Sequence, residues 1–200
     1  MKKEKFTYNN FFKIESLSTD KENDLSFFIE GIAAKKEIEN LNGHKFSGDN
    51  VFDLTTYLKN PILIVDHIEE TSRVIGRVVN ISEDNDVLRF RAKIRDIETV
   101  HSSYLKDAIQ SIKDGYLTGV SIGGFINRSE IKNNVVSRIE LHEISVVVSP
   151  ADTSAHISHI ENVTYCVNRL KRSLIKRFLS TKDDCYLKNF LKVKELFDEK

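Results

Sequence analysis

The segment Leu141–Pro150 reads LHEISVVVSP and gives the clearest indication of the fold class. Its apolar residues run from Ile144 to Val148, and Pro150, which cannot donate to a β-ladder, closes the run. An apolar run rich in valine and bounded by proline is typical of a buried strand. We therefore predict one long strand over residues 135–149, with the carboxylate of Glu143 beside its apolar end.

The side chains of this predicted strand alternate between its two faces. Glu143 then shares one face with Ser145, and His142 shares the other with Ile144. A carboxylate in a run of valines is costly to leave unpaired, so Glu143 requires a partner such as His67. Two alternatives stay open: Glu143 is an edge-strand charge that faces solvent, or His142 orients His67 in its place.

The chain upstream repeats the β pattern. Between two predicted strands, residues 82–86 read SEDND, a polar turn that indicates a β-hairpin. Residues 35–50 form a polar loop or flap, and Asn133-Asn134 indicates a further turn. The other predicted strands are Asp24–Ala34, Ile62–Val65, Arg73–Ile81, Val87–Ile94 and Leu117–Ile126.

Helical spacing predicts the remaining elements. Apolar residues recur at this spacing over Thr99–Tyr116, and Gly115 suits the C-terminal cap of that helix. A short helix is predicted over Asp53–Leu58, and two or three helices are predicted in the segment that follows Pro150. The apolar stripe of this last segment consists of Leu170, Leu174, Ile175, Phe178 and Leu179.

Together these elements predict an α+β protein. It has a mostly antiparallel β body of about six or seven strands, one inserted helix and a helical C-terminal tail. We predict a body over residues 1–160 and a tail over residues 161–200 that contacts a partner. A chain of 200 residues can bury a core large enough to fold without disulfides or metals.

The composition disfavours several classes of protein. The formal net charge is +0, so no global field attracts nucleic acid or an anionic membrane, and no repulsion opposes self-association. Cys166 and Cys185 form no CxxC motif, which favours a reducing compartment. Residues 1–13 lack the apolar run of a signal peptide, and no stretch approaches the roughly 20 apolar residues that span a bilayer. We expect neither a nucleic-acid nor a membrane partner.

A serine among glycines is the candidate nucleophile. Thr118–Phe125 reads TGVSIGGF, in which Gly119 precedes Ser121 and Gly123 and Gly124 follow it. Catalysis by serine requires a hydroxyl, a base and donors for the oxyanion, and glycines leave backbone N–H groups accessible. The G-x-S-x-G elbow of α/β-hydrolases requires a strand-to-helix turn, whereas the strand pattern continues here. The alternative role is a bulge or close-packing site.

His67 is the candidate base. It follows an apolar strand and Asp66, so its side chain can enter a cleft at the strand end, although a structural histidine is the alternative. His156 and His159 have the spacing of metal ligands on a helix, but no third ligand is evident, so no metal or cofactor is predicted. The basic cluster 169–177 is balanced by later acids and indicates a solvated helix face.

Four motifs follow one another along the chain: NPILIVDH at 60–67, IGRV at 75–78, GVSIGGF at 119–125 and LHEISVVVSPADTSA at 141–155. Their order and spacing resemble the prohead (capsid-maturation) proteases of tailed phages over Asp24–His159. That family has a histidine after an apolar strand, an I/L-G-R hairpin and a serine strand with S-(F/I)-G-F. An L-x-E-(V/I)-S-(L/V)-V strand closed by Pro-Ala follows.

The resemblance implies a fold and a set of site residues. The fold is a β-barrel shared with the herpesvirus assemblins and surrounded by helices. The activity is that of a serine endopeptidase without a cofactor, in which Ser121 is the nucleophile, His67 the base and Glu143 the orienting residue. Because the assemblins use a histidine as third member, His142 remains the alternative.

The chain departs from the family pattern at two positions. Ile68 stands where many members have aspartate, and Asp66 precedes the histidine instead. Gly124 interrupts the usual S-x-G-F, so a shift of the oxyanion donors is expected.

The resemblance also implies partners and a location. Scaffold and major capsid proteins, and the chain itself, are the implied substrates, cleaved inside the assembling prohead in the host cytoplasm, and a dimer is allowed. Two other functions stay open. A non-enzymatic scaffold or shell protein on the same fold would tolerate Ser121→Ala. In an unrelated β-barrel binding module, His67, Ser121 and Glu143 would lie far apart.

Overall fold

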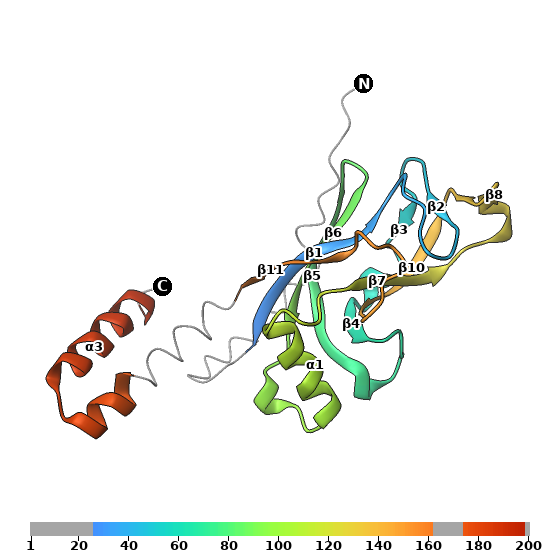
Figure 1. Cartoon of the computed structure of the whole chain (residues 1–200). Coiled ribbons are helices and arrows are strands. Elements are labelled where there is room, and N and C mark those ends of the chain that lie inside the picture. Colours follow the sequence, from blue (N-terminus) through green and yellow to red (C-terminus); the bar gives the residue numbers. More distant parts are fainter. Residues whose placement is uncertain (1–25, 162–173, 199–200) are drawn as a thin grey trace.

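The computed structural model describes residues 26–161 and 174–198. The body contains an eight-stranded sheet, a small three-stranded sheet and the helix α1 (Figure 1), which confirms the α+β class. The strands are β1 (Phe27–Lys35), β2 (Lys45–Phe46), β3 (Phe52–Asp53), β4 (Ile62–Val65), β5 (Val74–Asp84), β6 (Val87–Ile94), β7 (Val120–Phe125), β8 (Ile131–Lys132), β9 (Val135–Val136), β10 (Ile139–Val146) and β11 (His156–Glu161). The helices are α1 (Ser103–Lys113), α3 (Asp184–Asp198) and the short 3-10 helices Tyr57–Lys59, Thr71–Arg73, Ile97–Thr99 and Arg128–Glu130.

One half of the sheet is an antiparallel unit in which β6 lies between β1 and β5. Asn85 and Asp86 join β5 to β6 with φ values of 48° and 67°. Two successive residues with positive φ are the mark of a type I′ hairpin turn, which matches the twist of the strands. The predicted hairpin is confirmed, and its inward side chains, such as Ile75 and Leu88, are fully buried in the core.

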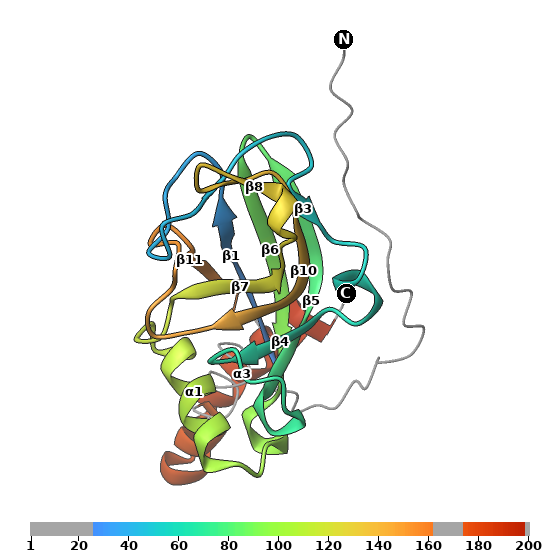
Figure 2. The same ribbon diagram turned by 90° about the vertical axis from the view of Figure 1, so that its right-hand side faces the viewer.

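β10 is the centre of the other half of the sheet. It pairs in parallel with β4 and with β3, and antiparallel with β7. Figure 2 shows β4, β10 and β7 lying side by side. Two strands replace the single strand predicted over residues 135–149. The first, β9, ends at Val136 and pairs with β2 and β8, and the second, β10, begins at Ile139. The predicted helix over residues 53–58 is shorter than expected and forms a 3-10 turn at Tyr57–Lys59.

The prediction of a closed barrel is wrong, because the sheet is open between β7 and β11. A single isolated bridge, from Gly119 to His156, joins the segment before β7 to β11. Antiparallel strands form a ladder only where they overlap. β7 and β11 lie side by side only at their first residues. There Val120 N–H donates to Ala155 O at 3.2 Å, and Ile157 N–H donates to Thr118 O at 2.8 Å. The two strands then diverge, so the ladder stops.

α1 is the one long helix within residues 26–161, so the described body is not surrounded by helices as expected. The Oγ of Ser102 caps the helix by accepting from Leu105 N–H. Gly115, with φ 77°, supplies the left-handed conformation that ends it. The buried side chains of α1 are Leu105, Ala108, Ile109 and Ile112.

β11 replaces part of the helical segment that the sequence predicts after Pro150. Its pairing with β1 places His156 and His159 on a strand instead of a helix. Within the described ranges, 26–161 and 174–198, no three His, Cys, Asp or Glu side chains are grouped so that they could hold a metal ion.

The C-terminal described residues form two helical segments, residues 174–181 and α3, on either side of Lys182, whose φ is 58°. The guanidinium of Arg177 lies 5.8 Å from the Tyr186 ring. Of the predicted apolar stripe, Leu170 lies outside the described residues, and Ile175 and Leu179 are 40% and 59% exposed. Among the described helices, none has the length and apolar character that crossing a membrane requires. The division into a body and a tail stays a prediction.

Candidate active site

A β-bulge in β10 determines which of its side chains face the core. The register with β7 shifts between Leu141 and Glu143, so His142 is the extra residue. In a regular strand Leu141 and Ile144 would point to opposite faces, but with the bulge both are buried in the core. Glu143 and Ser145 therefore face the other side of the sheet.

β7 presents the candidate serine on that same face. Ser121 lies directly opposite Ser145, and Gly123 lies opposite Glu143. Opposed residues on paired strands project to the same face, so the Ser121 hydroxyl shares a face with the Glu143 carboxylate. A Cβ on Gly123 would lie 2.1 Å from Glu143 Oε1, so glycine leaves the room that this carboxylate occupies.

β4 ends in a tight turn that carries His67. Asp66 and His67 have φ values of 59° and 57°, and Ile68 N–H donates to Val65 O at 3.3 Å. Non-glycine residues rarely adopt this left-handed conformation, and such residues cluster at functional sites. The parallel pairing of Val65 with Val146 brings the turn to the apolar end of β10.

Three side chains from the two strands form one hydrogen-bonded network. His67 Nδ1 lies 2.5 Å from Glu143 Oε1. The Ser145 hydroxyl donates to Glu143 Oε2 at 2.5 Å and accepts from the backbone N–H of His67 at 3.2 Å. Glu143 and Ser145 are 5% and 0% exposed, whereas the His67 side chain is 43% exposed. The network thus holds an accessible imidazole on a buried carboxylate.

Glu143 also favours the protonated form of His67. Its hydrogen bond raises the pKa of His67 above the ordinary 6.5; burial of the ring opposes this effect, and the negative charges of Glu143 and Asp66 add to it. An imidazole with a raised pKa binds a proton more tightly, which suits a general base.

Ser121 completes the set of three predicted residues on one sheet face. Ser121 is 5% exposed. Within residues 26–161 its hydroxyl makes no hydrogen bond to His67. Such bonds are often long in enzymes without substrate and tighten in the complex. Close approach of Ser121 Oγ to His67 Nε2 stays a prediction.

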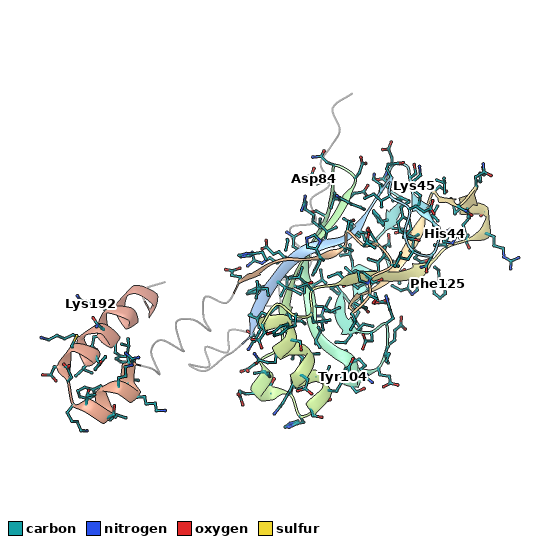
Figure 3. All side chains as sticks on the ribbon, viewed as in Figure 1. His44, Lys45, Asp84, Tyr104, Phe125 and Lys192 are labelled. Atoms are coloured by element: carbon teal, nitrogen blue, oxygen red, sulfur yellow. The ribbon has the colours of Figure 1, made fainter. Side chains whose placement is uncertain are left out.

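His142, the alternative orienting residue, points elsewhere. Its ring packs edge-on against Phe125, with centroids 4.5 Å apart, and its Nε2 lies 3.4 Å from Glu140 Oε1. Figure 3 labels Phe125 at the end of β7. Phe125 and Glu140 oppose each other on the face that carries the candidate serine, so the predicted position of His142 beside Ile144 is wrong. Among the described contacts, Glu143 and not His142 reaches His67.

Two contacts near the site were missed by sequence reasoning. The Tyr104 hydroxyl of α1 donates to Asp66 Oδ2, and the Arg73 guanidinium lies 3.9 Å from the Tyr104 ring centroid. Burial raises the pKa of Tyr104, and its bond to Asp66 and that charge add to the effect. Tyr104, labelled in Figure 3, is 38% exposed, and its hydroxyl ties α1 to the turn before His67.

Several solved structures align with this chain, all at low identity. The capsid assembly protease of bacteriophage T4 aligns with a TM-score of 0.47 and 13% identity over 62% of this chain and 82% of that one. A Kaposi's sarcoma herpesvirus (KSHV) protease aligns with a TM-score of 0.44 and 12% identity over 84% of this chain and 76% of that one. The varicella-zoster virus protease aligns with a TM-score of 0.42 and 15% identity over 84% of this chain and 76% of that one.

The sequence match is the firmer comparison. No curated protein matches the chain. The family model described as caudovirus prohead serine protease matches residues 50–168, a range that contains His67, Ser121 and Glu143. Since the match spans more than half of the 200 residues, this protein belongs to the caudovirus prohead serine protease family.

Proposed function

We propose that this chain is a serine endopeptidase in which Ser121 is the nucleophile, His67 the general base and Glu143 the orienting residue. One observation carries the proposal. A buried carboxylate lies 2.5 Å from His67 Nδ1, on the sheet face that also carries Ser121. An imidazole held at Nδ1 presents Nε2 to a hydroxyl, which is the arrangement that serine proteases use.

The mechanism follows from these roles. Ser121 Oγ attacks the scissile carbonyl carbon while His67 Nε2 takes the hydroxyl proton, and a tetrahedral oxyanion forms. Glu143 accepts from Nδ1–H, so it fixes the tautomer and stabilises the imidazolium. His67 then gives the proton to the leaving amine, and water hydrolyses the acyl-enzyme by the same route. Backbone N–H groups near Ser121 or from a neighbouring loop receive the oxyanion.

The family supports the choice of substrates and location. Members act on proheads, so the proposed substrates are scaffold and major capsid proteins, together with the chain itself, inside the assembling prohead in the host cytoplasm. The half-exposed apolar side chains of residues 174–181 support a separate role for the tail, residues 161–200, as a control element that contacts a partner.

Co-expression tests the proposal directly. The wild-type chain, Ser121→Ala and Ser158→Ala would each be expressed with the capsid and scaffold proteins encoded beside it, and the products identified by mass spectrometry. Ser158 is the matched control, because it is an exposed serine on β11. We expect wild type and Ser158→Ala to yield the same new termini and Ser121→Ala to yield none. Cleavage by Ser121→Ala would contradict the proposal, and assembly that needs the chain but no cleavage would favour a scaffold protein.

A further inference from the structure

Ser145 is a fully buried hydroxyl at the centre of the site. It lies opposite Ser121 on the paired strand, and it contacts both other members of the proposed triad. We infer that Ser145 is a positioning residue that holds Glu143 and His67 in their reactive arrangement. The inference rests on the proposed function, but one of its tests does not require hydrolysis.

The hydrogen bonds of Ser145 have only one consistent direction. A backbone N–H can only donate, so Ser145 Oγ accepts from His67 N–H at 3.2 Å. An ionised carboxylate can only accept, so the single hydroxyl proton goes to Glu143 Oε2 at 2.5 Å. One oxygen atom therefore links the backbone of His67 to the carboxylate that holds its ring. Both the position and the side-chain orientation of His67 depend on it.

The carboxylate of Glu143 needs this second anchor. The terminal torsion of a glutamate is broad and roughly two-fold, so one hydrogen bond through Oε1 fixes the carboxylate plane poorly. Ser145 binds Oε2 and thereby fixes the direction in which Oε1 meets His67 Nδ1. In a residue only 5% exposed, Oε2 without this donor would lose a bond that water does not readily replace.

Ser145 is not a second nucleophile. Its residue is 0% exposed, and its proton is committed to Glu143. Nucleophilic attack requires the oxygen to reach a substrate carbonyl, which a fully buried side chain in the middle of a sheet cannot do. The two facing serines therefore have different roles: Ser121 is the nucleophile, and Ser145 orients Glu143 and His67.

A matched pair of substitutions isolates the hydroxyl. Ser145→Thr and Ser145→Val have the same shape and differ in one hydroxyl for one methyl group, so both fill the buried position alike; Ser145→Ala is the smaller reference. Each variant would be checked by thermal unfolding. Its kcat and KM would be measured on a peptide spanning a cleavage site identified by mass spectrometry. The Nδ1–H resonance of His67 would be followed by NMR, with His67→Ala to assign it.

We expect Ser145→Val and Ser145→Ala to lower kcat by about 10- to 100-fold with KM unchanged, and to broaden or shift the His67 Nδ1–H resonance. Ser145→Thr should keep kcat within about threefold of wild type and leave the His67 Nδ1–H resonance unchanged. Equal kcat and an unchanged resonance in the Thr and Val variants would overturn the inference. If wild type cleaves nothing but the resonance still changes only in Val and Ala, the positioning role stands and the proposed protease function fails.

Discussion

Adding one methyl group at Gly123 should disable the site while the fold survives. A Cβ there would lie 2.1 Å from Glu143 Oε1, whereas ordinary van der Waals contact begins at 3.4 Å. The carboxylate oxygen must therefore retreat by about 1.3 Å, which is enough to stretch its 2.5 Å contact with His67 beyond the usual hydrogen-bond limit of about 3.2 Å. The three nearest atoms all belong to the flexible Glu143 side chain, so the backbone need not move.

The displacement sets the size of the effect. A shift of about 1 Å in a positioned group lowers the rate by about 100-fold, or about 2.7 kcal/mol in the activation free energy. We expect Gly123→Ala to lower kcat by about this factor, measured on a cleavage-site peptide, with the melting temperature nearly unchanged. Gly124→Ala is the contrast, because its Cβ would lie 2.2 Å from the backbone carbonyl oxygen of Glu140 and should lower stability instead.

A double-mutant cycle identifies the route of the effect. If Gly123→Ala acts only by displacing the carboxylate, it should lower kcat no further in a Glu143→Ala background. Full activity of Gly123→Ala would refute the steric argument. An equal loss in both backgrounds would show that Gly123 acts through another group, such as an oxyanion donor.

The other predictions concern the same network and the tail. Glu143→Gln should lower kcat by about 10⁴-fold with the fold intact, and His142→Ala by less than about threefold; the reverse ranking in peptide assays would transfer the orienting role to His142. Because His67 must be neutral to accept a proton and Glu143 raises its pKa, kcat/KM should rise with pH through a midpoint above 6.5. Stability should change in the opposite sense. The contribution of the His67–Glu143 pair is complete below about pH 6.5 and is lost as pH rises through the raised pKa, so urea unfolding at a series of pH values should show a decline that His67→Ala lacks. Tyr104→Phe removes the hydrogen bond to the turn before His67 and should lower kcat by about 3- to 10-fold with KM unchanged; wild-type kcat would contradict this role. Truncation after Glu161, the last residue of β11, should leave cleavage intact and weaken self-association, as gel filtration would show, whereas loss of folding would make the tail part of the core.

The elements that the sequence predicts well are those with local signals at both ends. Ile62–Val65 and Val87–Ile94 match β4 and β6 residue for residue, because the apolar run of the first and the alternating pattern of the second are bounded by polar or proline residues. Gly115 likewise marks the end of α1. β11 was missed, because its sequence HISHIE has little apolar character and the strand forms through pairing with the distant β1.

The residues of the candidate site could be chosen from the sequence, but most of their contacts could not. Glu143 and His67 follow from their motifs, and their 2.5 Å contact agrees with the expected pairing. The bulge at His142 has no local signal, since it depends on the register between β10 and β7. The room that Gly123 leaves for the carboxylate depends on the same register, so the alternation rule alone could not identify it.

The separation of the site residues along the chain has a consequence during translation. His67 and Glu143 are 76 positions apart, and β10, which carries Glu143, bridges the strands of His67 and Ser121. A ribosome that adds about 5–20 residues per second needs about 4–15 seconds to extend the chain from one residue to the other. During that interval the nascent chain holds a histidine and, later, a serine without the strand that unites them. Under the proposed mechanism, the nascent chain therefore cannot cleave a neighbouring polypeptide before β10 is synthesised.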